Sequence, residues 1–140
     1  IARNLTEQSE ADGCVICDGG GHMLVQEGTG TDDPLLLSAL GAGVFAGSRK
    51  LAQMLGEEDF SAVFHQGEHK SIFIRAVNDN TLLVVIFTKQ DGAGLVKLYA
   101  GPASERIKSL LESAGESGDE IDDAERSFVL RDGTDIFKTG

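Results

Sequence analysis

The sequence predicts an α+β domain in which a β-sheet built from consecutive strands lies between two layers of helix. Residues 61–88 form three predicted strands joined by two short turns, and a helix follows them directly. The last strand contains six consecutive apolar residues, 82–87, and a strand without a polar face must be covered on both faces. Short turns between consecutive strands favour antiparallel pairing. The predicted order of elements is a helical stub, two strands, a helix, three strands and a final helix.

The N-terminal part predicts a short helix followed by a hairpin. Ile1 and Leu5 have the i, i+4 spacing of one helix face. Two strands, at residues 13–18 and 22–26, are separated by three glycines at 19–21. A triple glycine can indicate a phosphate-binding loop, but a P-loop requires the motif G-x-x-x-x-G-K-[ST] opening a helix. Because a second strand follows here, we expect a hairpin turn.

Cys14 and Cys17 form a C-x-x-C motif, which in other settings indicates zinc binding or a redox dithiol. Both lie in a predicted strand, where residues three apart point to opposite faces of the sheet. The chain has no second C-x-x-C, and of the three histidines only His22 is close in sequence. We therefore expect two buried free thiols in a reducing compartment, with metal binding or redox chemistry as the alternative.

Residues 34–55 predict a long helix, with Asp32 or Asp33 as its N-cap and Pro34 in its first turn. One arc of this helix gathers bulky apolar side chains with two glycines close by, and we expect it to sit on the sheet. The arc comprises Leu36, Leu40, Val44, Leu51 and Met54, with Gly43 and Gly47 beside it.

The opposite side of this helix carries small residues around one aromatic ring, Phe45, and we expect that ring to be largely in water in a monomer. Such a surface suits contact with a second protein. The alternative is that a loop or the tail of the same chain shields Phe45. Arg49 lies on this predicted interface helix, where we expect an arginine to anchor a partner rather than to act as a catalytic finger. The residues predicted to bind a partner are Leu35, Ser38, Ala42, Phe45, Arg49 and Gln53.

In the strand at residues 71–77, Ile72, Ile74 and Ala76 alternate with Phe73, Arg75 and Val77 on opposite faces. With residues 81–88 central, the strand at 61–66 lies at the sheet edge. It has no lysine or proline to protect it. We expect it to pair with an identical strand across a two-fold axis, or to be covered by a tail. The predicted dimer interface comprises Ser61, Ala62, Val63, Phe64, His65 and Gln66 from this strand with Ser38, Ala42 and Phe45 from the helix.

The C-terminal part predicts a helix from residue 93, interrupted at Gly101-Pro102. From Gly115 the chain becomes polar and acidic, while residues 127–139 could form a small hairpin or a hydrophobic strap. We therefore expect a domain at residues 1–114 and an acidic C-terminal extension at 115–140 that is partly docked.

The formal net charge is −11, of which −5 falls in residues 115–140 (eight acidic and three basic) and −6 in the rest. Both parts repel phosphate backbones and anionic lipid, so we expect no nucleic-acid partner. No stretch approaches the roughly 20 apolar residues of a membrane span, and nothing resembles a secretory leader. We expect no membrane insertion and a soluble, cytoplasmic protein.

The chain resembles the Roadblock family, the dynein light-chain relatives that include bacterial MglB-type regulators. The resemblance covers residues 11–112, and its specificity lies in the order and spacing of its elements. Its matching stretches are residues 13–18 with 21–24, the small-residue helix at 36–55, residues 64–67 through 81–87, and residues 94–98. The resemblance implies a profilin-like αββαβββα fold with a five-stranded antiparallel sheet in the order 2-1-5-4-3. It also implies homodimerisation through the third strand and second helix, which form a platform for a Ras-like small GTPase.

These observations predict a non-catalytic, homodimeric regulator or scaffold that binds a Ras-like small GTPase and could bias its switch loops toward hydrolysis. We expect no catalytic residue, cofactor or metal in this chain. His65 and His69 flank an exposed turn, and the paired aspartates before the long helix suit a cap. The alternative is a ligand-sensing module with a similar sheet, which would require a cavity.

Overall fold

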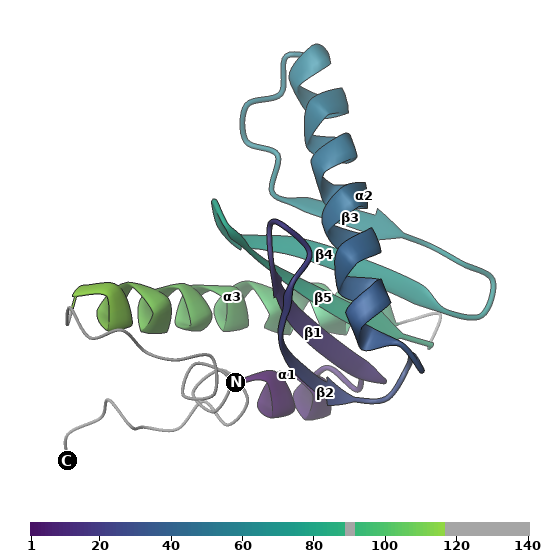
Figure 1. Cartoon of the computed structure of the whole chain (residues 1–140). Coiled ribbons are helices and arrows are strands. Elements are labelled where there is room, and N and C mark those ends of the chain that lie inside the picture. The colour runs from purple at the N-terminus through teal and green to yellow at the C-terminus, as the bar shows by residue number, and fades with distance from the viewer. Residues whose placement is uncertain (89–91, 117–140) are drawn as a thin grey trace.

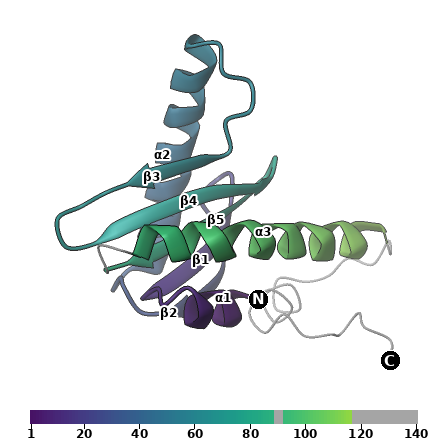
Figure 2. The ribbon, with the colours of Figure 1, turned by 180° about the vertical axis from the view of Figure 1, so that it is seen from behind.

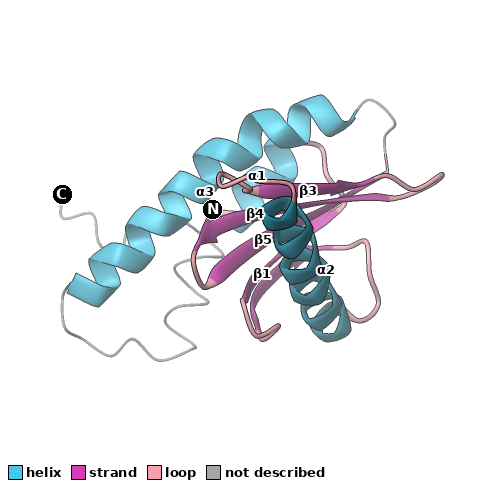
Figure 3. Ribbon diagram, turned by 90° about the horizontal axis from the view of Figure 1, so that it is seen from above, coloured by secondary structure: helices cyan, strands magenta, loops and turns pink. Residues whose placement is uncertain are grey.

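The computed structural model describes residues 1–88 and 92–116. It has three layers: helix α2 (Pro34–Met54) covers one face of the sheet, and helices α1 (Ala2–Gln8) and α3 (Gly92–Glu116) cover the other (Figures 1 and 3). The strands are β1 (Gly13–Asp18), β2 (Met23–Gly28), β3 (Ala62–His65), β4 (Ser71–Asn78) and β5 (Thr81–Phe87). The predicted fold class and element order are confirmed, and the ends of the short strands shift by one or two residues.

The sheet order is β2-β1-β5-β4-β3, and every neighbouring pair is antiparallel. This confirms the order that the family resemblance implied. β5 lies at the centre between β1 and β4, and all of its residues are buried. An unbroken apolar strand fits this position because both of its faces are covered. The predicted alternation along β4 is also present: Phe73 and Val77 join the core beneath α1 and α3, whereas Ile74 joins the core beneath α2.

The hairpin between β1 and β2 brings the triple glycine against the start of α2. Gly21 has φ +88°, and a Cβ atom at this position would lie 2.8 Å from Cα of Ala39. Asp18 Oδ1 holds the turn by accepting hydrogen bonds from the backbone N–H groups of Gly20 and His22, at 3.0 and 2.9 Å. The glycines therefore form the hairpin turn that the sequence predicted, and Gly21 in addition permits a close approach of α2.

α2 begins as the sequence predicted. Asp33 is the N-cap, and its Oδ1 accepts a hydrogen bond from the backbone N–H of Leu36 at 3.0 Å. Pro34 occupies the first turn, where its missing N–H leaves no donor unpaired. In Figure 1 the C-terminal turns of α2 rise past β3, so this helix is longer than the sheet beneath it.

The orientation of α2 about its own axis is opposite to the prediction. Its sheet-facing residues are small apart from Phe45, and they include Ser38, Gly41, Ala42 and Ala52. The predicted core residues lie on the outer side, with exposed fractions between 45% and 80%; they are Leu36, Leu40, Val44, Leu51 and Met54. The strands supply the bulk on this side of the sheet: a Cβ atom at Gly41 would lie 3.6 Å from Cγ2 of Val84. Because the strand side chains fill most of the interface, the helix contributes small residues and the single ring of Phe45 to it.

Of the kink or break predicted at Gly101 and Pro102, the break is absent, since α3 continues through both residues as one helix. Pro102 is exposed. Proline in a helix interior removes one backbone hydrogen bond, and on the solvent side water can satisfy the freed carbonyl. The predicted hairpin or strap at residues 127–139 and the docked extension lie outside the described residues.

Candidate interaction surface

The outer face of α2 is an apolar surface that the rest of the described chain leaves open. We define it as Leu36, Leu40, Gly43, Val44, Gly47, Leu51 and Met54. Gly43 and Gly47 lie one turn apart, and a Cβ atom at either would have no neighbouring atom within 4 Å. Their backbone is therefore accessible between flanking apolar side chains over about 27 Å of helix. Contiguous apolar surfaces of this kind mark interaction sites in folded proteins.

Strand β3 offers a second open surface beside α2. It is the last strand of the sheet, and it pairs only with β4 among the strands in residues 1–88. Its sequence contains no charge-bearing lysine and no proline, so its outer edge can accept another strand. Phe64 is 38% exposed on the α3 side of the sheet, where its ring centroid lies 5.8 Å from that of Phe87.

The structure separates the predicted site residues into two groups. Phe45 is only 4% exposed, and Ser38 and Ala42 are also buried against the sheet, so the prediction that they form an exposed interface in a monomer is wrong. The ring of Phe45 lies 5.2 Å from that of Phe60, a loop residue before β3. Loop shielding was the alternative at the sequence level. The remaining predicted partner residues stay accessible: Leu35 and Gln53 are exposed and Arg49 is half-buried.

Three residues of the candidate surface, Leu40, Val44 and Leu51, are exposed although the sequence predicts them in the core. Their spacing identifies one apolar arc of α2 but does not show which way that arc faces. The signal that could have corrected this is the pair Gly43 and Gly47 within the same arc, since exposed glycines cost roughly 1 kcal/mol each in a helix and permit close backbone contact.

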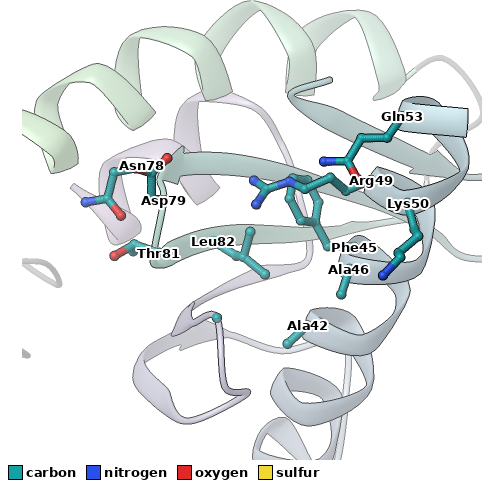
Figure 4. A pocket seen from close by; sticks show the side chains of 11 residues that line it. Ala42, Phe45, Ala46, Arg49, Lys50, Gln53, Asn78, Asp79, Thr81 and Leu82 are labelled. Carbon is teal, nitrogen blue, oxygen red and sulfur yellow. The ribbon is translucent and has the colours of Figure 1, made fainter. Parts of the chain in front are cut away.

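A cleft of about 210 Å³ opens between the flank of α2 and the turn that joins β4 to β5 (Figure 4). Arg49 and Gln53 extend from the helix toward Asn78 and Asp79 on the turn. The guanidinium carbon of Arg49 lies 5.1 Å from the centroid of the Phe45 ring, which forms the floor of the cleft. Small-molecule sites usually measure about 300–1,000 Å³, so this cleft suits a side chain better than the ligand of a sensory module.

The two thiols lie on opposite faces of β1, as predicted. Cys14 joins the core beneath α1 and α3, and Cys17 joins the core beneath α2. Both are free and buried, and burial raises the pKa of each thiol to about 11. Among residues 1–88 and 92–116, no group of three or more metal-binding side chains comes together.

We expect both thiols to resist alkylation by iodoacetamide at pH 8 in the folded protein and to react once urea unfolds it. Mass spectrometry after timed quenching measures the reaction.

The unfolded chain releases the thiol protons near pH 9.0 and the folded chain near pH 11. The free energy of unfolding should therefore fall as the pH rises from 9 to 11. Rapid alkylation of either thiol in the native state would contradict this burial.

α2 is long and apolar enough to cross a membrane by length and composition, with a mean hydropathy of 1.2 in its most apolar window. The prediction that no stretch approaches a membrane span is therefore wrong for this helix. Length and hydropathy alone are weak support for a membrane span, because core helices of soluble proteins can meet both criteria. Phe45 and Ala42 pack on the sheet, so one side of α2 is already occupied by protein.

The fold, the open β3 edge and the small-residue helix can be compared with known proteins. The family model of the Roadblock/LC7 domain matches residues 1–87 of this chain. The chain belongs to the Roadblock/LC7 family. No curated protein matches it significantly. Solved structures do, and three bacterial Roadblock proteins of the MglB type are similar over most of their length.

Myxococcus xanthus MglB is 31% identical, with a TM-score of 0.75, and the match covers 80% of this chain and 92% of that one. The gliding protein MglB from Thermus thermophilus is 27% identical, with a TM-score of 0.75, over 81% of this chain and 87% of that one. A structure of MglB with a tetrameric arrangement is 26% identical, with a TM-score of 0.75, over 81% and 86%. The Roadblock assignment from sequence is thus confirmed.

Proposed function

We propose that this Roadblock protein is a non-catalytic, homodimeric regulator that binds a Ras-like small GTPase in the cytoplasm. The observation that carries the proposal is the apolar outer face of α2, exposed directly beside an unpaired β3 edge. The resemblance of the chain to MglB-type proteins, one of which has a tetrameric arrangement, supports an assembled state.

The dimer uses both open surfaces at once. Pairing of β3 with β3 of a second copy would continue the sheet across a two-fold axis, and the same axis would bring the two α2 helices together. Gly43 and Gly47 allow the helix backbones to approach closely while Leu40, Val44 and Leu51 supply apolar contact. A two-fold contact is self-complementary, so each of these residues acts twice.

The GTPase binds the flanks of the paired helices, which the dimer contact does not cover. Arg49 and Gln53 lie on the cleft side of α2, about 120° or more around the helix from the centre of its outer face. Phe45 holds the Arg49 side chain by a cation–π contact, which reduces the entropy lost when the guanidinium binds a partner. Arg49 therefore acts as an anchor in a cleft sized for a side chain of the partner.

Nucleotide-dependent binding tests this function. Ras-like small GTPases from the same cell, loaded with a non-hydrolysable GTP analogue or with GDP, are titrated with the protein by calorimetry. We expect tighter binding to the GTP state and a roughly tenfold loss on Arg49→Gln, the size typical of an interface anchor. Lys108→Gln on α3, on the other side of the sheet, is the matched control and should leave the affinity unchanged. Equal affinity for both nucleotide states, or no binding to any GTPase, would refute the proposal.

A further inference from the structure

On the α3 side of the sheet, β4 carries an unusual arginine, Arg75, next to the edge strand β3. Arg75 Nε is buried and has no hydrogen-bond partner, and Arg75 forms no ion pair with any residue in 1–88 or 92–116. A partly buried guanidinium without a counter-ion is destabilising, because it loses hydration without compensation. Buried polar groups of this kind require an explanation in terms of an additional partner.

Arg75 belongs to a cationic cluster around an exposed aromatic ring. Arg75 stands opposite Ala62, and Phe73 opposite Phe64, so Phe64 and Arg75 are diagonal neighbours on one face of the sheet. The ammonium of Lys97 on α3 lies 5.2 Å from the centroid of the Phe64 ring, and Lys97 has no carboxylate partner within the described ranges. Two positive charges thus flank Phe64.

α3 covers this surface only in part. α3 packs on β4 and β5, and Figure 2 shows β3 and the adjoining part of β4 alongside the helix. We define the basic edge patch as Phe64, Arg75 and Lys97. Its chemistry suits an acidic peptide that also carries apolar side chains, because the cations attract carboxylates and the ring provides apolar contact.

The chain itself contains such a peptide beyond α3. Residues 119–125 include five acidic residues and no basic one, and Phe128, Val129 and Leu130 follow shortly after. We propose that this acidic segment of the same chain docks on the basic edge patch, with its carboxylates at Arg75 and Lys97 and the apolar residues near Phe64. The proposal concerns the opposite face of the sheet from the GTPase cleft and does not depend on the proposed function.

The reach of the chain fits this contact. From Lys97 to the end of α3 at Glu116 the helix covers about 28 Å. The nine residues from 117 to 125 span up to about 30 Å when extended, so the acidic segment can return along α3 as far as Lys97. The apolar residues that follow it then reach the neighbourhood of Phe64.

Zero-length carbodiimide cross-linking of the full chain tests the contact directly. We expect mass spectrometry to find amide bonds between Lys97 Nζ and carboxylates in residues 119–125, at least fivefold more often than bonds from Lys108, a matched lysine on the same helix. Copies labelled with ¹⁴N and ¹⁵N are mixed before the reaction. Links found only between copies, or spread equally over the lysines, would overturn the proposal.

A second measurement uses charge coupling and does not require a reactive lysine. Arg75→Gln should lower the urea midpoint of the wild-type chain, but it should leave the midpoint unchanged or raise it in a chain with a neutralised acidic segment, where the guanidinium has lost its proposed counter-ions. Equal shifts in both backgrounds would overturn the proposal, because they would show no coupling. The neutralising substitutions are Asp119→Asn, Glu120→Gln, Asp122→Asn, Asp123→Asn and Glu125→Gln.

Discussion

Replacing Phe45 with alanine is expected to lower the free energy of unfolding by about 3–5 kcal/mol, the usual cost of removing a buried phenylalanine. Phe45 is 4% exposed, and its ring packs on Phe60 and in the core formed by Ala42, Leu82 and Val84. The substitution leaves a cavity between α2 and the sheet that the rigid β5 cannot close. Urea denaturation monitored by circular dichroism measures the loss, at several protein concentrations because dimerisation is linked to stability.

The matched control for Phe45→Ala is Leu98→Ala, which shortens an apolar side chain that is 62% exposed on α3. We expect its effect to stay within about 0.5 kcal/mol, as for most surface substitutions. The outcome that contradicts the structure is a stable Phe45→Ala variant whose dimer dissociates. That result would place Phe45 at the intermolecular interface that the sequence predicted.

Val44→Glu is expected to weaken the homodimer about 100-fold or more, since each copy would bury an unpaired carboxylate at the two-fold contact. Val44 lies on the outer face of α2, about midway along the helix between Leu40 and Leu51, and it is 45% exposed. In the isolated subunit the side chain points to solvent, so the fold should survive the substitution. Sedimentation equilibrium over a range of concentrations gives the dissociation constant, and circular dichroism confirms the fold.

Ala46→Glu is the matched control for the dimer, because it places the same charge on the same helix but on the flank that lines the cleft. It should leave the dimer intact and weaken GTPase binding. A wild-type protein that sediments as a monomer would remove the dimer from the proposal. If both glutamate variants remained fully dimeric, the contact would have to lie elsewhere than on α2.

Much of the fold could be predicted because it depends on local patterns. The alternation along β4 and the apolar run of β5 identify strands with one or two covered faces. Asp33 and Pro34 mark the start of α2, and the glycines after Asp18 mark a hairpin. Each of these signals rests on backbone geometry or side-chain alternation within a few residues, which distant contacts rarely override.

The candidate site could be predicted only in part. The sequence predicted α2 and the β3 edge as interaction elements, and both present open surfaces in the structure, with Gln53 exposed and Arg49 half-buried on α2. It failed on the rotation of α2, because a hydrophobic arc was equated with the buried arc. In a protein with an interaction surface that equation fails: Leu40 and Leu51 are 60% and 63% exposed while Ala42 is buried.

The sequence by itself determined the order of helices and strands, the central place of the strand at Leu82–Phe87, the helix cap and the acidic character of the C-terminal residues, because these follow from composition and short-range periodicity. Only the tertiary structure decided which side of α2 meets the sheet and which polar groups lack a partner. The bulk of Ile74, Leu82 and Val84 leaves room for one large helix side chain, Phe45, and otherwise for small residues, and that packing turns the other large apolar side chains of α2 outward. The amino-acid pattern within α2 does not show how much space the side chains of the neighbouring strands occupy.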